Sequence, residues 1–505
     1  MPRVSLPAPV RRLLGDLRRV WRRHHADGYI VGGCLRDLLL DRPVRDIDVA
    51  LAGDPTLLAQ VAAEATGGRA FGLDEERGIM RVVLPEGAAV SYVDITLLRV
   101  DIESDLAQRD FTIDAMALPL AAVSRRAPQP LIDPYAGAGD LRGGLVRAVG
   151  DGVFRADGLR LLRAVRLCAE LGFFLDDATA ALIRRDAAYL DPVAPERKRD
   201  ELVRILATRE SGGSLRQLDG LGLLERVLPE VTACRGVTQP KEHYWDVFDH
   251  LIETVVALDF MLSEEAPAGS REHAFWRELW EQLAWLPGSR EHFREELVEG
   301  RSRAALLKLA GLLHDIAKPE TKAPDRTGRI RFLGHVDLGA EKAASIMQRL
   351  RFSNVETRLV ATIVESHLRP GQMSNEGPPT QRAVYRFFRD TADAALDILF
   401  LTLADHLAAR GPRLHLQTWR KHVAFVSYIL GRYHLELPPA PPVRLVTGED
   451  VMSELEIAPG PLVGRLLAAI EEARALGEIS TREEALDLAR RLFLAEASSP
   501  KAASR

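Results

Sequence analysis

The sequence has 505 residues and only three cysteines, Cys34, Cys168 and Cys234. So few thiols in so long a chain exclude a disulfide framework and are typical of a protein of the reducing cytoplasm. The sequence also lacks an uninterrupted apolar run of about 18 residues and an apolar segment near its N-terminus. We therefore expect a cytoplasmic protein with no membrane-spanning helix and no signal peptide.

An excess of positive charge is missing as well. The chain carries 67 Lys and Arg against 72 Asp and Glu, a formal net charge of −5. A balance of this kind argues against unspecific coating of DNA, although it is compatible with a local RNA site. The length predicts roughly three or four domains, and no internal repeat is evident.

The most informative stretch is residues 28–51, which predict a strand, a Gly-Gly turn, a short helix and a second strand. Gly32 and Gly33 have no side chains, so backbone N–H groups at this turn can approach a phosphate. Arg36 adds a guanidinium group for the same phosphate. The turn is therefore a predicted phosphate-binding element.

Two carboxylates occupy the second strand of this stretch. Asp46 and Asp48 flank Ile47, so both side chains point to one side of the strand. Carboxylates held side by side repel each other unless a cation lies between them. Together with the Gly-Gly turn they indicate metal-dependent nucleotidyl transfer. The alternative is a surface Asp-x-Asp pair after an ordinary turn.

Strands and helices continue to alternate up to about residue 120, as in a small α/β domain with a mixed sheet. We predict a helix over 56–66 and strands over 79–84 and 90–96. Asp94, in the second of these strands, would supply a third carboxylate beside the first two. The alternative is an acid at a strand end that faces solvent.

A basic segment over 154–167 predicts a helix in which Asp157, Arg160 and Arg163 are spaced i, i+3 and i+6 along one drifting face. An aspartate and an arginine together offer an acceptor and donors to the edge of a base. Such a pair permits selection of C and A without a nucleic-acid template. An ordinary ion pair on a helix is the alternative.

A second group of polar residues surrounds His314-Asp315, an adjacent pair on a predicted apolar helix. The residues that accompany this pair are His250, His335, His367 and Asp405. Imidazoles and carboxylates suit a divalent transition metal that keeps positions open for water. The alternative is a helical domain whose histidines have no catalytic role.

Five motifs within residues 28–228 resemble, in the same order, those of bacterial-type CCA-adding enzymes, which are tRNA nucleotidyltransferases of the poly(A) polymerase family. The motifs are Gly32-Gly33 with Arg36-Asp37 and Asp46-Ile-Asp48, then Arg109-Asp110-Phe-Thr-Ile-Asp114, Asp133-Pro-Tyr135 with Gly137 and Asp140, Asp157-Gly-Leu-Arg160, and Glu196-Arg197 through Glu201. The histidine-containing group resembles the HD phosphohydrolase superfamily.

The resemblance implies that Asp46 and Asp48 use Mg²⁺ to add nucleotides from CTP and ATP to the 3′ end of tRNA with release of pyrophosphate. Asp94, from its place in the neighbouring strand, is a candidate third catalytic acid. The residues implied to bind the nucleotide are Gly32, Gly33, Arg36, Arg109, Asp110, Asp157, Arg160 and Arg163. At the second site His250, His314, Asp315 and Asp405 would be the core ligands. His335 and His367 would serve a second metal or a phosphate, and Ni²⁺, Co²⁺ or Mn²⁺ would support hydrolysis of phosphate esters.

We expect an α+β fold in which an α/β nucleotidyltransferase head with a mixed sheet is followed by all-helical parts. The head covers residues 1–150, and a helical neck for nucleotide selection and tRNA binding covers 151–235. An HD domain follows over 236–436, and a helical tail over 443–505. The Pro-rich segment 437–443 is a predicted stiff linker.

Two features depart from the family pattern. Ala156-Asp157-Gly158 takes the place of the usual Glu-Asp-Pro, so the acid that would steady the arginine is missing. The segment between Asp94 and Arg109 is also short, as it is in related enzymes that add only CC. CC addition alone, poly(A) polymerase activity, and an HD phosphohydrolase whose head binds nucleotide without transferring it therefore stay open, as does the oligomeric state.

Overall fold

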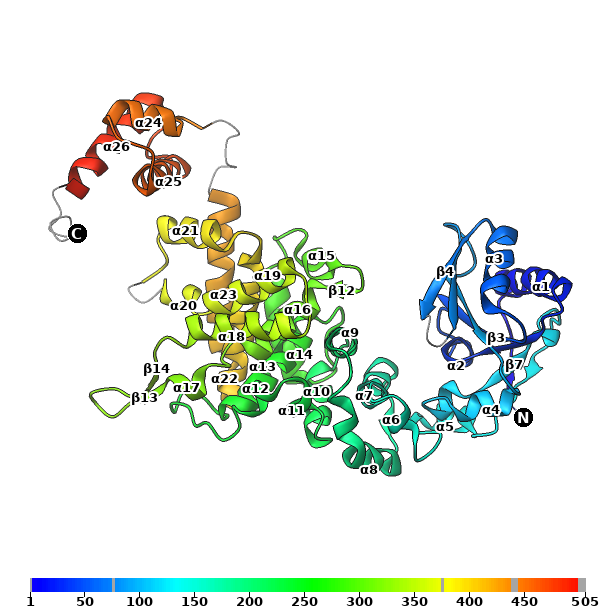
Figure 1. Ribbon diagram of the computed structural model, residues 1–505. Helices are drawn as coiled ribbons and strands as arrows, with labels where there is room; N and C mark the ends of the chain where they lie inside the picture. The colour runs from blue at the N-terminus through cyan, green and yellow to red at the C-terminus, as the bar shows by residue number, and fades with distance from the viewer. Residues whose placement is uncertain (1, 75–77, 374–376, 437–443, 498–505) are drawn as a thin grey trace. The chain divides into compact units, whose positions relative to one another are not determined.

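The structure, a computed structural model, describes residues 2–74, 78–373, 377–436 and 444–497 (Figure 1). It divides into two compact units, Met1–Pro229 and Glu230–Arg505. The finer domain boundaries stay a prediction, and the predicted Pro-rich linker lies outside the described residues. Within the described residues no helix is both long and apolar enough to cross a membrane.

A six-stranded sheet forms the centre of the first unit, with the strand order β4-β5-β6-β3-β2-β7. The strands are β2 (Gly28–Val31), β3 (Asp46–Leu51), β4 (Arg69–Asp74), β5 (Ile79–Val83), β6 (Tyr92–Leu97) and β7 (Ala117–Pro119). β3 and β6 run parallel and the other neighbours run antiparallel, so the predicted mixed sheet is confirmed. β4 was not predicted, because its glycine and terminal aspartate weaken the strand signal.

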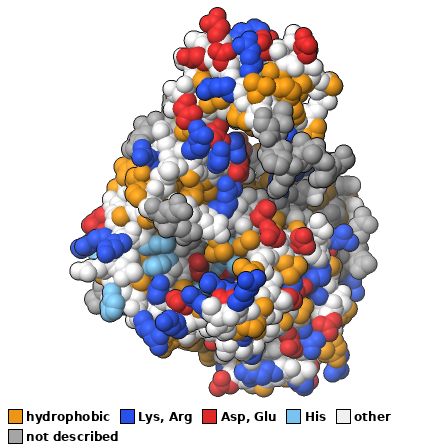
Figure 2. Space-filling model, turned by 90° about the vertical axis from the view of Figure 1, so that its left-hand side faces the viewer, with side chains coloured by type: hydrophobic (Ala, Val, Ile, Leu, Met, Phe, Trp, Pro, Cys, Tyr) orange, Lys and Arg blue, Asp and Glu red, His pale blue; other side chains and the backbone are white. Residues whose placement is uncertain are grey.

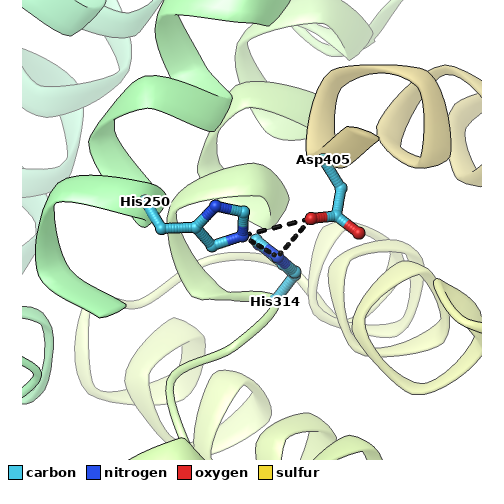
Figure 3. Close-up of side chains that lie close together, drawn as sticks. All are labelled: His250, His314 and Asp405. Carbon is cyan, nitrogen blue, oxygen red and sulfur yellow. Dashed lines mark hydrogen bonds and ion pairs between the residues drawn. The ribbon is translucent and has the colours of Figure 1, made fainter. Parts of the chain in front are cut away.

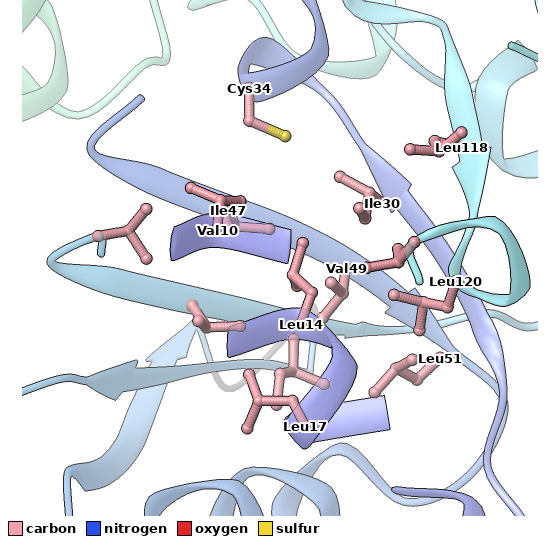
Figure 4. Packing of buried hydrophobic residues seen from close by; sticks show 14 of the residues in the cluster. Val10, Leu14, Leu17, Ile30, Cys34, Ile47, Val49, Leu51, Leu118 and Leu120 are labelled. Atoms are coloured by element: carbon pink, nitrogen blue, oxygen red, sulfur yellow. The ribbon is translucent and has the colours of Figure 1, made fainter. Parts of the chain in front are cut away.

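The two faces of this sheet have different neighbours. Ile47, Val49 and Leu51 of β3 pack with the helices α1 (Ala8–Arg23) and α3 (Pro55–Thr66) in one hydrophobic core (Figure 4). Because side chains alternate along a strand, Asp46 and Asp48 point to the opposite face. That face carries a smaller apolar cluster and the polar site described below.

The remaining helices of this unit are short. They are α2 (Gly33–Leu39), α4 (Ile102–Ala107), α5 (Gly137–Gly143), α6 (Val153–Ala156), α7 (Arg160–Leu171), α8 (Asp177–Asp186), α9 (Pro195–Leu206), α10 (Ser211–Gly220) and α11 (Leu224–Val227). Two predictions need correction here. The helix over 154–167 is interrupted between α6 and α7, and the neck also contains a strand, β10 (Phe174–Leu175), paired with β9 (Leu145–Val146).

The prediction that the second unit is all-helical also needs correction, because its described residues include two short hairpins, β11 (Glu296–Val298) with β12 (Arg301–Ser302) and β13 (Lys322–Pro324) with β14 (Ile330–Phe332). Its helices are α13 (Val247–Leu262), α14 (Ser270–Gln282), α15 (Ser289–Arg294), α16 (Arg303–Leu313), α17 (Lys318–Thr321), α18 (His335–Arg349), α19 (Asn354–Ser366), α20 (Arg369–Gln372), α21 (Gln381–Thr391), α22 (Ala395–Arg410), α23 (Leu416–Gly431), α24 (Gly448–Leu455), α25 (Pro461–Ala475) and α26 (Arg482–Ala497). The last three share a separate small hydrophobic core.

Basic and acidic side chains are interspersed over the face of the molecule drawn in Figure 2. This agrees with the small net charge of −5. Any binding of a polyanion would therefore depend on a few local groups rather than on the field of the whole protein.

Candidate active site and metal centre

The sheet brings three carboxylates together on one face. β3 and β6 are parallel, and their register pairs Asp48 with Asp94 and Asp46 with Tyr92. Residues paired in this way project to the same face, so Asp94 lies beside Asp48, one strand away. The structure thus brings together the three acids that the sequence analysis singled out.

The Gly-Gly turn approaches these acids closely. Gly32 has a positive φ of 79°, which favours glycine. A Cβ atom at this position would lie 2.6 Å from Oδ2 of Asp48 and 3.0 Å from Nη1 of Arg109. The backbone at Gly32, the Asp48 carboxylate and the Arg109 guanidinium therefore lie close together.

The electrostatic environment of Asp48 favours a bound cation. Burial raises the pKa of Asp48 to about 7, and the negative charges of Asp46 and Asp94 act in the same direction. The positive charge of Arg109 opposes this rise. A cluster of carboxylates whose charges destabilise one another is the donor set that Mg²⁺ prefers, so these residues fit a magnesium site.

Arg36 lies in a buried ion-pair network. Its Nη1 donates to Oδ1 of Asp114 at 2.8 Å and its Nε to Oδ1 of Asp37 at 3.0 Å. Burial raises the pKa of Asp114, and the Arg36 guanidinium opposes that rise. The guanidinium expected to reach a phosphate is thus held by two carboxylates.

A cavity of about 270 Å³ extends from the Gly-Gly turn to the neck. The residues that line it are Gly32, Gly33, Asp48, Asp105, Gln108, Arg109, Asp110, Asp114, Asp157, Leu159, Arg160, Arg163 and Arg197. Most of the residues predicted to bind nucleotide thus face one cavity. The exception is Arg36, and of the three predicted catalytic acids Asp46 and Asp94 are also not among the lining residues.

The neck side of this cavity is built around the interruption between α6 and α7. Asp157 has an extended backbone, φ −155° and ψ 109°, and so lies outside both helices. A Cβ atom on Gly158 would lie 1.9 Å from the carbonyl oxygen of Tyr189, so only glycine fits this close approach. The predicted face at i, i+3 and i+6 is therefore wrong, although the three side chains do line the same cavity.

Each polar side chain on this wall is held in place. The Asp157 carboxylate accepts from both terminal nitrogens of Arg197, at 2.8 and 3.3 Å. Nη2 of Arg160 donates to the carbonyl oxygen of Gln108 at 2.9 Å, which steadies the arginine in the absence of the family's usual glutamate. Nε of Arg163 lies 3.1 Å from Oδ2 of Asp110. Two arginines, Arg163 and Arg160, lower the pKa of Asp110 although burial opposes this.

A larger cavity of about 610 Å³ adjoins the first one. It is lined by the end of β6, the following turn, α4 and α6, and it shares Asp105, Gln108, Arg109 and Arg160 with the 270 Å³ cavity. Val100, 79% exposed, lies in that turn. The link between Asp94 and Arg109 therefore shapes the wall of an open space beside the carboxylates.

The second group of predicted ligands converges in the other unit. Nε2 of His250, from α13, lies 3.1 Å from Oδ1 of Asp405, from α22, and 3.3 Å from Nε2 of His314 at the end of α16 (Figure 3). Both imidazoles are fully buried. Two ring nitrogens that face each other at this distance need a proton or a metal ion between them.

The other three ligands complete this centre. Nε2 of His314 lies 3.2 Å from Oδ2 of Asp315, and Nε2 of His335 lies 3.4 Å from its Oδ1. Nε2 of His367 is 3.8 Å from the same Oδ1. Ligand atoms of His314, Asp315 and His367, like those of His250, His314 and Asp405, lie within 4.8 Å of one another. The structure therefore brings all six predicted ligands to one place.

The histidine tautomers suit metal binding. Nδ1 of His314, His335 and His367 lies 2.8, 2.5 and 2.7 Å from a backbone carbonyl oxygen three residues earlier. A carbonyl only accepts, so Nδ1 carries the proton and Nε2 offers its lone pair, as in metal-bound histidines. Oδ1 of Asp315 and Nε2 of His335 are buried without a hydrogen-bond partner. These residues fit a divalent metal ion.

Sequence reasoning missed three residues at these sites. Arg197 holds Asp157, Arg81 of β5 pairs with Asp94, and Lys318 forms an ion pair with Asp315. Lys318 follows Asp315 by three residues, a spacing that pairs side chains on a helix. Arg81 and Arg197 are distant in sequence from their partners, so no local pattern indicates them.

Three family models match this chain. The poly A polymerase head domain covers residues 28–147, the probable RNA and SrmB-binding site of polymerase A covers 172–235, and the HD domain covers 278–410. The last range contains every predicted ligand of the second centre except His250. The order of the three models agrees with the order of the motifs in the sequence.

Curated relatives match nearly the whole chain. An A-adding tRNA nucleotidyltransferase of Deinococcus radiodurans is 36% identical over 90% of this chain and 93% of its own length. A CC-adding tRNA nucleotidyltransferase of Thermus thermophilus is 34% identical over 91% and 92%. Among solved structures, the Thermotoga maritima CCA-adding enzyme complexed with tRNA aligns with a TM-score of 0.57 at 21% identity over 96% of this chain and 95% of that one.

Proposed function

Since the chain belongs to the tRNA nucleotidyltransferase family, whose members match it at 36% and 34% identity over nine-tenths of its length, we propose that it adds C and A to the 3′ end of tRNA from CTP and ATP. The reaction releases pyrophosphate and uses no nucleic-acid template. One observation carries the proposal: the cavity that Asp48 lines is also lined by a carboxylate and a guanidinium, Asp157 and Arg160, placed to read a base edge.

In this proposal Asp46 and Asp48 hold Mg²⁺. When bound, the metal supplies positive charge that activates the RNA 3′-hydroxyl and stabilises the departing pyrophosphate. The Gly32-Gly33 backbone and Arg109 lie where the triphosphate would be bound, since both approach Asp48. Arg36 supports this turn through its ion pair with Asp114 rather than by direct contact with phosphate.

Selection of the base falls to the neck side of the cavity. The Asp157 carboxylate can accept from the exocyclic amino group that C and A share, and Arg160 can donate to the adjacent ring nitrogen. Guanine and uracil present a carbonyl oxygen instead of that amino group, so a carboxylate repels them. Arg163 and Asp110, paired at 3.1 Å, line the same cavity.

A partial reaction is the second candidate. Only α4 and two short turns join β6 to Arg109, and the two relatives described above are named A-adding and CC-adding. Addition of two C residues alone, or of the final A alone, would follow if this short link fails to accommodate one of the acceptor ends. Residues of this link line the adjoining 610 Å³ cavity.

One assay separates these functions. Labelled CTP and ATP are supplied with tRNA that lacks its 3′ end, with tRNA that ends in C, and with tRNA that ends in CC, and product length is read. The proposed function predicts completion of CCA on all three. A stop after CC would indicate addition of CC alone, and extension of only the CC-ended substrate would indicate addition of A alone. A long A tail would indicate a poly(A) polymerase, and the absence of product would indicate a head that does not transfer nucleotides.

For the HD unit we propose a metal-dependent phosphohydrolase. The six convergent ligands support binding of Ni²⁺, Co²⁺ or Mn²⁺, with the Lys318 ammonium close to Asp315. The metal would supply activated water, and the surrounding protein fixes its ligands in the correct tautomer. Hydrolysis of 2′,3′-cyclic nucleotides and of phosphomonoesters with each metal tests this, and a purified protein that binds none of them would overturn it.

A further inference from the structure

Asp94 has a partner that the other two acids of the head lack in the register of the sheet. β5 and β6 pair Arg81 directly with Asp94. Nε of Arg81 donates to Oδ1 of Asp94 and Nη2 donates to Oδ2, both at 2.7 Å. This is the two-pronged geometry in which a guanidinium binds a carboxylate most strongly.

The Arg81 side chain is also held by an aromatic contact with Tyr92. Its guanidinium carbon lies 4.7 Å from the centre of the Tyr92 ring, and Tyr92 is the register partner of Asp46. Asp94 is 6% exposed, so the ion pair is shielded from water on its acidic side. The aromatic contact and the fork of hydrogen bonds leave the arginine little freedom.

The position of this pair matters because it borders the metal-binding acids. Asp48, Asp94 and Arg81 lie in one row across β3, β6 and β5, on the face opposite the α1–α3 core. Without Arg81 the carboxylates of Asp48 and Asp94 in this row, with Asp46 two residues along β3 on the same face, would have no cationic partner in the row. Three such charges would bind a divalent ion more tightly and would destabilise one another in its absence.

We propose that Arg81 is a positioning residue that holds Asp94 outside the coordination shell of the catalytic metal, so that Asp46 and Asp48 alone provide the protein ligands. The inference rests on the proposed function of the head. Arg81 neutralises the third carboxylate and keeps it pointing along the strand pair rather than toward Asp48. With only Asp46 and Asp48 as protein ligands, the head would bind a divalent ion less tightly than with three carboxylates.

The test measures metal binding by the full chain without RNA or nucleotide. Binding of Mn²⁺, a spectroscopic substitute for Mg²⁺, is followed by electron paramagnetic resonance of the free ion. Sites that disappear in the Asp48→Ala variant are assigned to the head, which separates them from the HD centre. Arg18→Ala is the matched control, because Arg18 pairs with Asp27 and belongs to α1, on the other face of the same sheet.

Asp94→Asn should leave Mn²⁺ affinity at the head within about two-fold of wild type, since Asp94 is not a ligand. Arg81→Ala should tighten binding roughly 10-fold by releasing a carboxylate, and Arg81→Ala with Asp94→Asn should restore the wild-type affinity. Loss of a merely structural ion pair would weaken binding instead.

A roughly 10-fold weaker affinity in Asp94→Asn, or no tightening in Arg81→Ala, would overturn the inference. A different result, extension of tRNA by the Asp48→Ala variant, would overturn the proposed function of the head.

Discussion

The carboxylate of Asp157 is bound by the guanidinium of Arg197, at 2.8 Å from Nη2 and 3.3 Å from Nη1. Arg197 belongs to the first turn of α9, and Asp157 lies between α6 and α7, so the pair joins two parts of the neck. The backbone N–H of Leu159 donates to the same carboxylate at 3.1 Å. Asp157 is therefore aimed into the cavity by groups that do not themselves need to touch the base.

Removing Arg197 should weaken nucleotide binding more than the chemical step. Arg197→Ala removes the guanidinium that binds Asp157, and because Arg197 is half-exposed we expect a modest effect, about a 5-fold rise in KM for CTP and ATP with little change in kcat. Steady-state addition to tRNA measures both constants. Arg199→Ala is the control on the same helix, since Arg199 pairs with its neighbour Asp200. An unchanged KM in Arg197→Ala would contradict this role.

Gly158 should tolerate no side chain. A Cβ atom would lie 1.9 Å from the Tyr189 carbonyl oxygen, so Gly158→Ala should destabilise the neck by about 3 kcal/mol and displace Asp157. Thermal unfolding of the full chain and the KM for CTP measure the two effects. Gly152→Ala is the matched control, because φ is −90° there and no atom lies within 4 Å of the added carbon. Equal melting temperatures for the two variants would rule out the close approach.

Arg36 should stabilise the head rather than bind phosphate. Arg36→Ala leaves the buried Asp114 carboxylate without its guanidinium partner, and we expect a loss of about 3 kcal/mol in stability. Replacing both, as Arg36→Met with Asp114→Leu, should recover much of it. The KM for CTP of this double variant distinguishes the two roles. A rise of about 10-fold or more in this KM, in a stably folded protein, would show that Arg36 binds the triphosphate.

The patterns that predicted the head correctly are local ones. Alternation of Ile47 and Val49 with Asp46 and Asp48 identifies β3, and the predicted helix over 56–66 is found as α3. The interruption at Asp157 was not predicted, and the close approach of Gly158 to Tyr189 that accompanies it joins residues 31 apart in sequence (189 minus 158). Pairing of Arg36 with Asp114 spans 78 residues and likewise leaves no local trace. Long-range contacts of this kind decide which arginines reach a ligand.

The histidines of the second centre were easier to predict, because residue type alone restricts their chemistry. Four imidazoles and two carboxylates, spread over residues 250–405, meet in one largely buried cluster. Their tautomers could not be predicted, since the carbonyl groups that accept from Nδ1 are positioned by the helix ends. Ligand type is thus a property of the sequence, whereas ligand direction is a property of the fold.

The two centres should be separable by single substitutions. Asp315→Asn keeps the volume of the side chain but removes a charged ligand, so it should abolish binding of Ni²⁺, Co²⁺ or Mn²⁺ at the HD centre and any hydrolysis of 2′,3′-cyclic nucleotides. Addition of labelled CTP to tRNA should continue. Asp48→Ala should have the converse effect, with no nucleotide addition and intact metal binding in the HD unit.

Metal content by mass spectrometry and the two activity assays, run on the same preparations, check both expectations. Asp337→Ala is the control, because Asp337 is exposed two residues after His335 on α18. Circular dichroism verifies that Asp315→Asn remains folded, since Asp315 is 2% exposed and paired with Lys318. If folded Asp315→Asn retains stoichiometric metal, Asp315 is not a required ligand and its assignment to the metal centre is wrong. If it instead loses nucleotide addition together with the metal, the two units depend on each other in catalysis.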